Sequence, residues 1–186
     1  DIPAKVDGRA KYGLDVRLIE GDIRDLSALG DDVFDVVWNA HSINFVPDPR
    51  PVFDGVARVL RRGGLYRLQW TNPFVQGIWD APWVAGGYPL RHRYVDGGEM
   101  SYDDPVWNVT RADGSRERVR GPREWRHSLG TVVNGLIARG FEIRLLREET
   151  SDAVDPAPGT DAHRETIAPF WLTLWAARGP AGPPPR

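Results

Sequence analysis

The stretch DDVFDVVWNAHSINFVPDPRPVFDGVARVLRRGGLYRLQW, from Asp31 to Trp70, decides the fold of this chain, because it predicts a strand, a helix and a second strand in succession. The run from Val33 to Trp38 is short, apolar and β-branched, which is typical of an interior strand with helices on both faces. Asp48 lies just before two prolines in a helix-start pattern, and apolar residues then recur every three or four positions up to Gly63–Gly64, which we expect to end the helix. A strand pattern resumes from Leu65 to Trp70.

This unit also predicts where a ligand binds. A helix that joins two neighbouring strands by a right-handed crossover makes them parallel. The loop after the first strand, Asn39 to Pro47, then lies at the carboxyl edge of the sheet. Open α/β sheets bind their ligands at that edge.

The rest of the chain continues an α/β pattern around an insertion. We expect one α/β domain over residues 1–178, with an inserted substrate cap over 71–121, and a disordered tail over 179–186. The other predicted helices are at Ile2–Tyr12 and Arg123–Arg139, and the other predicted strands are at Val16–Ile19, Phe141–Leu146 and Phe170–Ala177. Ile23–Gly30 is expected to be a loop or a single helical turn, and Val106–Val109 is expected to form a hairpin with Arg116–Val119.

Composition excludes several classes of protein. The net charge is −2 and no basic cluster exceeds pairs such as Arg61–Arg62, so we expect no nucleic-acid partner. The 186 residues include no cysteine, which excludes disulfides and thiolate chemistry and agrees with a cytoplasmic location. No apolar run approaches the roughly 20 residues that span a bilayer, so no membrane partner is expected.

The insertion is rich in tryptophan and tyrosine and shows no long helical period. These aromatic residues either form a lid over a small-molecule site or pack the insertion against the sheet, and both readings stay open. Its acidic and basic residues are nearly balanced, so the insertion does not indicate a strongly charged substrate.

Several motifs, in order and spacing, resemble the class I S-adenosylmethionine-dependent methyltransferases that act on small molecules. The motifs are GDIRDL (Gly21–Leu26), FDVVWNAHSINFVPDP (Phe34–Pro49), VLRRGGLYRL (Val59–Leu68), ARGFEI (Ala138–Ile143) and FWLTLWAARG (Phe170–Gly179). The resemblance implies a Rossmann-like α/β methyltransferase sheet of seven strands, the last antiparallel. Five strands are assigned here. The first two strands cannot be assigned, and no glycine-rich loop occurs before Gly21, so the sheet is expected to be incomplete at its N-terminal side.

The same resemblance assigns cofactor contacts residue by residue. Asp1 matches the end of the family's second strand, where an acidic residue accepts from the ribose hydroxyls. Asp22 matches the carboxylate that accepts from the adenine amino group, and Ile23 matches the residue that offers its backbone N–H and packs on the ring. Asn39 and Ala40 match the end of the fourth strand, beside the cofactor.

His41 is the candidate catalytic residue, because an imidazole with a pKa near ~6.5 can take a proton from a hydroxyl or amine nucleophile. The alternative is a histidine that only holds the loop together. His92, His127 and His163 lie far apart and lack metal-ligand spacing, so no metal site is expected.

The function predicted first is methyl transfer from S-adenosylmethionine to a small-molecule acceptor, with upstream residues required. The alternative is a non-catalytic, methyltransferase-like module for binding or assembly. A third reading, a dinucleotide oxidoreductase, lacks its glycine fingerprint. Because the strand at Val16–Ile19 is expected to lose its neighbours, self-association through an exposed sheet edge is also predicted.

Overall fold

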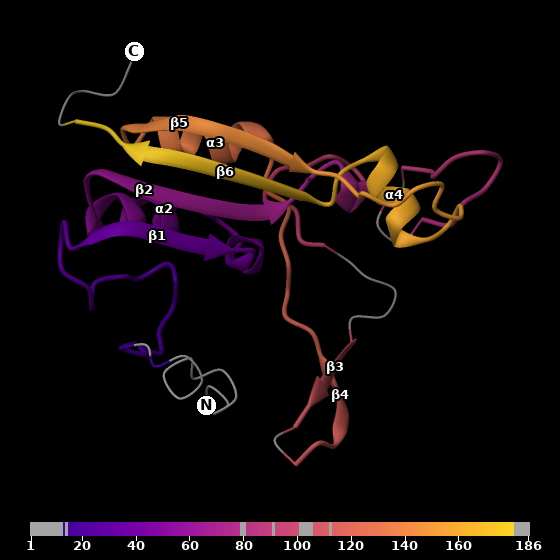
Figure 1. The fold of residues 1–186 in the computed structure, drawn as a ribbon, viewed down its shortest axis with the longest axis horizontal. Coiled ribbons are helices and arrows are strands. Elements are labelled where there is room, and N and C mark those ends of the chain that lie inside the picture. Colours follow the sequence, from indigo (N-terminus) through magenta and orange to yellow (C-terminus); the bar gives the residue numbers. More distant parts are fainter. Residues whose placement is uncertain are drawn as a thin grey trace.

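The fold is built on one four-stranded sheet (Figure 1). A computed structural model describes residues 13, 15–78, 81–90, 92–100, 106–111 and 113–180. The strands are β1 (Phe34–Ala40), β2 (Leu60–Thr71), β5 (Phe141–Glu149) and β6 (Trp171–Arg178), in the spatial order β1-β2-β6-β5. β1 is parallel to β2, whereas β6 lies antiparallel between β2 and β5. The predicted crossover unit and the antiparallel last strand are therefore confirmed.

Two helices cover one face of this sheet, α2 (Arg50–Val59) and α3 (Leu129–Ile137), which lie behind the strands in Figure 1. The core lies between them and the strands, because every second residue of β2 and β6 points toward the helices. This core consists mainly of fully or almost fully buried side chains from β2, β6, α2 and α3: Tyr66, Leu68, Trp70, Leu172, Leu174, Val52, Phe53, Val56, Val132 and Leu136.

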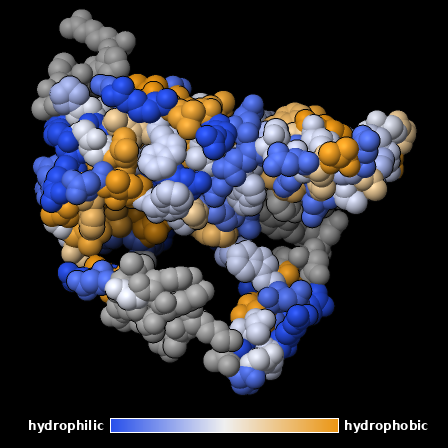
Figure 2. All heavy atoms as spheres, in the orientation of Figure 1, coloured by the Kyte–Doolittle hydropathy of each residue, from blue (hydrophilic) through white to orange (hydrophobic). Residues whose placement is uncertain are grey.

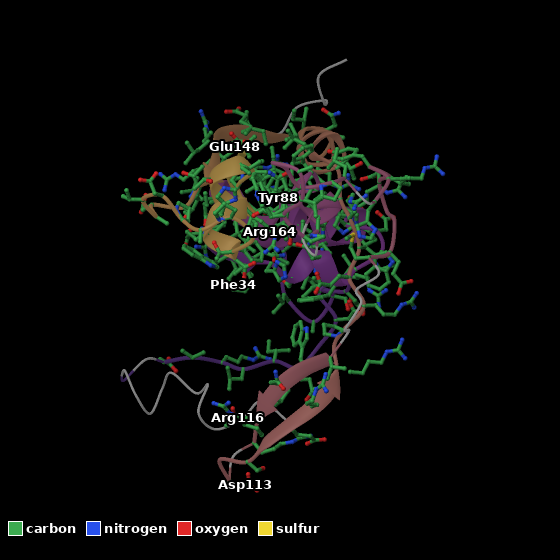
Figure 3. The ribbon with its side chains drawn as sticks, turned by 90° about the vertical axis from the view of Figure 1, so that its right-hand side faces the viewer. Phe34, Tyr88, Asp113, Arg116, Glu148 and Arg164 are labelled. Carbon is green, nitrogen blue, oxygen red and sulfur yellow. The ribbon has the colours of Figure 1, made fainter. Side chains whose placement is uncertain are left out.

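A smaller cluster lies beyond the carboxyl end of β2. Here the segment with the 3₁₀ turn η3 (Val75–Gly77) packs against the region of α4 (Asp161–Ile167), and Val75, Ile78, Ala81, Ala168 and Phe170 are buried together. The hairpin of β3 (Val106–Thr110) and β4 (Arg116–Arg120) instead projects away from the sheet, as the labelled Arg116 and Asp113 show in Figure 3. The predicted hairpin is confirmed.

The predicted helix end at Gly63–Gly64 is wrong. Helix α2 ends at Val59, and the fully buried Leu60 is already extended and paired with Phe34. Between the pairs Phe34–Leu60 and Val36–Leu65 the register shifts, and the left-handed Gly63 (φ 77°) lies in this irregular part of β2. A Cβ on Gly64 would lie 2.8 Å from the carbonyl oxygen of Arg61, so this glycine allows a close backbone approach.

The helix predicted at Arg123–Arg139 begins only at Leu129. The backbone N–H of Trp125 donates to the carbonyl of Asn44 (2.7 Å), and that of Arg126 donates to the carbonyl of Gly98 (2.9 Å). These donors hold the segment extended against neighbouring loops. Ser128 then caps α3, with its Oγ accepting from the N–H of Thr131 (3.1 Å).

The predicted strand at Val16–Ile19 is also wrong, because these residues join no sheet in the part of the chain that the structure describes. The main sheet accordingly has four strands there, not five, and the strand predicted at Val33–Trp38 lies at its edge instead of its interior. Its side chains on one face stay exposed, among them Trp38. The strands predicted at Leu65–Trp70, Phe141–Leu146 and Phe170–Ala177 are confirmed within β2, β5 and β6.

Some predictions fall elsewhere. Asp1, the helix at Ile2–Tyr12 and most of the tail lie outside the described residues. Among the helices that the structure does describe, none is long and apolar enough to cross a membrane.

Candidate cofactor and acceptor site

The loop after β1 lies at the carboxyl edge of the parallel pair β1–β2, as predicted. It begins at His41, whose backbone is left-handed (φ 68°) and whose N–H donates to the carbonyl of Gln69 (2.8 Å). The short turn η2 (Ser42–Phe45) follows. This left-handed conformation, which is uncommon for a non-glycine residue, turns the chain from β1 into η2.

Asn44 holds this loop in place. Its side chain is fully buried, and its Oδ1 accepts from the N–H of Thr71 at the end of β2 (3.1 Å). Its backbone carbonyl accepts from the N–H of Trp125 (2.7 Å). Asn44 therefore joins the loop, the sheet and the segment before α3, which places Trp125 beside the loop.

An open cleft of about 740 Å³ lies between this loop and the GDIRDL motif. It is lined by Glu20, Gly21, Asp22, Ile23 and Arg24 from the motif region, by Ser42, Phe45, Val46 and Pro47 from the loop, and by Arg123 and Trp125. The fold thus brings together two segments that the sequence marked separately, and the cleft is within the size range of small-molecule sites.

Asp22 carries the strongest charge arrangement in the cleft. Its carboxylate accepts from the Nε of Arg24 (2.9 and 3.0 Å) and from the Arg24 backbone N–H (2.9 Å). These hydrogen bonds lower the pKa of Asp22 to about 2. The group is therefore ionised at neutral pH. Arg24 also donates from its terminal Nη2 to Oδ2, so both carboxylate oxygens accept two hydrogen bonds from Arg24, and a donor on a ligand would share or replace one of them.

Asn39 and Ala40 do not line the cleft. The Asn39 side chain is buried, and its Oδ1 accepts from the Oγ of Ser42 (2.5 Å). Ser42 does line the cleft, so the Asn39 side chain is linked to the cleft only through the Ser42 hydroxyl. Ala40 is exposed at the strand end.

His41 lies next to the cleft without lining it. Its half-buried ring packs edge-to-face on Phe45 (5.2 Å between centroids) and on Trp171 (4.6 Å). Burial lowers the pKa of His41, so the neutral imidazole predominates at neutral pH. Its Nδ1 is buried without a hydrogen-bond partner in the part of the chain that the structure covers. The imidazole is therefore unprotonated, as a general base must be, and it lies between the aromatic rings of Phe45 and Trp171.

The aromatic residues of the insertion fall into two groups. Trp83 and Tyr88 pack with His163 of α4, the Tyr88 hydroxyl lies 2.9 Å from His163 Nδ1, and the labelled Arg164 lies over the Tyr88 ring (Figure 3). Trp107 of β3 instead contacts Phe45, which lines the cleft (6.2 Å). The first group packs the insertion against α4, whereas Trp107 lies next to a cleft residue without lining the cleft itself.

Sequence reasoning missed Phe45, Arg123 and Trp125 as cleft residues. The Arg123 guanidinium lies over the Trp125 ring (5.1 Å) and is paired with Glu99. Arg123–Trp125 lies in a segment that the sequence predicts to be helical. No local pattern shows that the backbone N–H of Trp125 instead donates to Asn44 in the loop after β1. Among the described residues there is no cluster of His, Cys, Asp or Glu that could hold a metal ion.

Comparison with known proteins agrees with this arrangement. Residues 3–68 match the family model described as a methyltransferase domain. The chain is 28% identical over 139 residues to the uncharacterized methyltransferase YbaJ of Bacillus subtilis, an alignment that covers 74% of this chain and 51% of that protein. The chain therefore spans about half the length of this curated relative.

Solved structures show the same fold. An S-adenosylmethionine-dependent methyltransferase from Mesorhizobium loti superposes with a TM-score of 0.66 at 24% identity, covering 96% of this chain and 78% of the other. A putative one from Listeria monocytogenes gives 0.62 at 17% identity, covering 97% and 78%. The four-stranded sheet with two helices on one face is thus part of a known enzyme architecture.

Proposed function

We propose that the chain is a class I S-adenosylmethionine-dependent methyltransferase that serves methyl transfer to a small-molecule acceptor in the cleft between Gly21–Arg24 and Ser42–Pro47, because residues 3–68 match the methyltransferase-domain model. The observation that carries this proposal is the convergence of those two segments on one cleft of about 740 Å³. The whole protein's reaction is proposed to need residues beyond the segment described here.

The residues present fit S-adenosylmethionine at its adenine end. Asp22 places an ionised carboxylate on the cleft, suited to an exocyclic amine, and the neighbouring Ile23 offers an apolar side chain and a backbone N–H. When bound, S-adenosylmethionine supplies a methyl group that is already activated by its sulfonium. The chain then has mainly to align donor and acceptor, and alignment contributes up to roughly 7–11 kcal/mol.

His41 is proposed as the proton acceptor for a hydroxyl or amine on the acceptor. Its neutral ring, held beside the cleft against Phe45, supports this role. A positioned base contributes about 10²–10⁴-fold to a rate. Asn39 is proposed to orient Ser42 at the cleft through the 2.5 Å hydrogen bond, a supporting position instead of a direct contact.

One observation favours a second function. The sheet face opposite α2 and α3 carries exposed apolar side chains, with Trp38 62% and Val36 49% exposed, which suits a module that binds or assembles with another chain. A methyltransferase-like assembly module is therefore the alternative, and self-association is proposed through this face or the β1 edge. Cytoplasmic location and lack of a nucleic-acid partner stay predictions from the sequence.

The test is calorimetric titration of S-adenosylhomocysteine into the 186-residue chain and into the Asp22→Ala variant. We expect saturable binding that is weakened roughly 10-fold or more in the variant, because a hydrogen bond to a charged group contributes about 1.5–3 kcal/mol.

Asp25→Ala is the matched control, because Asp25 lies in the same turn, accepts from the N–H of Ser27 (2.9 Å) and does not line the cleft. Equal losses in both variants would mean that the turn, and not the Asp22 carboxylate, matters. A folded wild-type chain that binds nothing would favour the assembly module.

A further inference from the structure

A row of four aromatic rings runs along the carboxyl edge of the sheet and ends beside the cleft. It consists of Trp171 at the start of β6, His41, Phe45 and Trp107 on β3. Successive centroids are 4.6, 5.2 and 6.2 Å apart, and the ring planes meet at 83°, 89° and 70°. Each contact is edge-to-face, an arrangement that leaves ring surface open for a further aromatic partner.

Trp107 is the unusual member of this row. Its strand β3 pairs with β4 and with no strand of the main sheet in the described part of the chain. The Trp107 side chain is 48% exposed, although an indole gains most from full burial. A large ring that is held half exposed beside a cleft has the character of a ligand contact more than of a core residue.

Phe45 links this ring to the interior of the site, because it both lines the cleft and touches Trp107. Trp125 contributes a second aromatic side chain to the same lining. A flat molecule in the cleft would therefore meet rings from the loop and from the segment before α3, and Trp107 of the hairpin lies next to Phe45, just outside this lining.

Apart from Glu20, the charged side chains that line the cleft are paired within the chain. Asp22 pairs with Arg24, and Arg123 pairs with Glu99 and covers one face of Trp125. A strongly charged acceptor would have to compete with these pairs, whereas an uncharged ring would not. The balance of ring surface and paired charge therefore favours an aromatic acceptor.

We propose that the acceptor is a planar aromatic molecule, that its ring binds against Phe45 and Trp107, and that Trp107 sets the preference for flat over saturated acceptors. This inference rests on the proposed function and adds the substrate class. It makes the hairpin β3–β4 a carrier of one specificity residue at the mouth of the cleft.

The probes are 2-naphthol and its saturated counterpart decahydro-2-naphthol, titrated by calorimetry into the 186-residue chain with and without S-adenosylhomocysteine. We expect 2-naphthol to bind about 10-fold more tightly, because each aromatic ring contact is worth about 2- to 10-fold in Kd beyond area burial. Trp107→Ala should lose most of that preference and leave decahydro-2-naphthol little changed, whereas Trp107→Phe should restore most of it.

Asn108→Ala, at the next position of the same strand, is the matched control and should keep the preference. Equal affinity for both probes in the wild-type chain, or a preference that survives Trp107→Ala, would overturn the proposal. Circular dichroism verifies that each variant is folded, and Trp107→Phe tests the ring itself with little change in apolar bulk.

The two proposals fail separately. Trp107→Ala should leave S-adenosylhomocysteine binding unchanged, and Asp22→Ala should leave the naphthol preference unchanged. S-adenosylhomocysteine binding without a preference for 2-naphthol would overturn only the aromatic acceptor. A Trp107-dependent preference without S-adenosylhomocysteine binding would overturn the methyltransferase function of this chain and leave an aromatic-binding site.

Discussion

The two faces of the four-stranded sheet are built from the same strands and yet differ in almost every physical respect. On the face toward α2 and α3, Tyr66, Leu68 and Trp70 of β2 are fully buried. On the opposite face Leu65 is 38% and Trp38 is 62% exposed. In Figure 2, drawn in the orientation of Figure 1, hydrophobic residues reach the surface over the sheet.

Local contacts only partly compensate the uncovered face. Trp38 packs edge-to-face on Trp175 (5.9 Å between centroids), and the Arg67 guanidinium lies over the Trp38 ring (4.1 Å). A cation over an indole contributes about 0.5–1 kcal/mol at an exposed site, less than full burial of an apolar side chain. The residues of the strands set how much apolar surface the sheet carries. The helices α2 and α3 determine how much of that surface is buried and so stabilises the fold.

The sharpest test of this difference uses two leucines on one strand. Leu68→Ala removes a fully buried side chain from the covered face and should lower the free energy of unfolding by about 2–5 kcal/mol. Leu65→Ala is the matched control three positions earlier on the other face, and it should lower that free energy by less than about 1 kcal/mol. Urea denaturation measures both, and equal losses would mean that the second face is also covered in solution.

A smaller change in the free energy of unfolding is expected from the protonation of His127, on the side of the sheet that α2 and α3 cover. His127 lies just before α3, is almost fully buried, and its Nε2 lies 2.9 Å from the carbonyl oxygen of Ile43. Burial lowers the pKa of His127 in the folded state. Above the unfolded pKa of ~6.5 its contribution to stability is fully present, and below that pH the unfolded chain binds more protons, so stability falls.

The variant His127→Asn should therefore reduce the loss of stability between pH 7 and 5. The difference in slope can approach about 1.4 kcal/mol per pH unit, the value for one proton. Denaturant titrations at several pH values measure it. Burial also lowers the pKa of His41, so the slope of stability against pH in His41→Asn is compared with the slope in His127→Asn. An unchanged slope in His127→Asn would show that its ring is protonated equally in both states.

The smallest effect on stability, with the clearest effect on association, is expected for Trp38→Glu. The side chain is mostly exposed, so the free energy of unfolding should change by no more than about 1 kcal/mol. If the uncovered face drives self-association, the variant should weaken it several-fold in sedimentation experiments. Arg118→Glu on the projecting strand β4 is a control change of charge away from this face. A wild-type chain that is monomeric at high concentration would end the argument for self-association.

The parts of the fold that could be predicted are those whose signals are local. The run at Val33–Trp38, the helix stripe after Asp48 and the strand at Leu65–Trp70 correspond to β1, α2 and β2, although the bounds differ. Parallel strands joined by a helix then require the loop after β1 to lie at the ligand edge, and it does. Asp22 and Ile23 followed from the motif resemblance, and the structure places both in the cleft.

The failures all involve partners that lie far away in the sequence. The glycine pair did not end α2 because β1 pairs with the residues before it, beginning at Leu60. The segment before α3 stayed extended because Asn44 and Gly98 accept its backbone hydrogen bonds. The strand predicted at Val16–Ile19 has suitable side chains but no neighbouring strand in the described chain, and an unpaired strand is not stable alone.

The sequence alone predicted the strand–helix–strand unit, the position of the ligand edge and the importance of Asp22 and Ile23, because periodicity, caps and motif spacing act over a few residues. Tertiary contacts were needed to show which face of the sheet is covered, that Asn39 hydrogen-bonds to Ser42, and that Phe45 and Trp125 line one cleft with Trp107 next to Phe45. These depend on contacts between segments tens of residues apart, and packing and hydrogen-bond geometry choose such contacts only when the chain is folded.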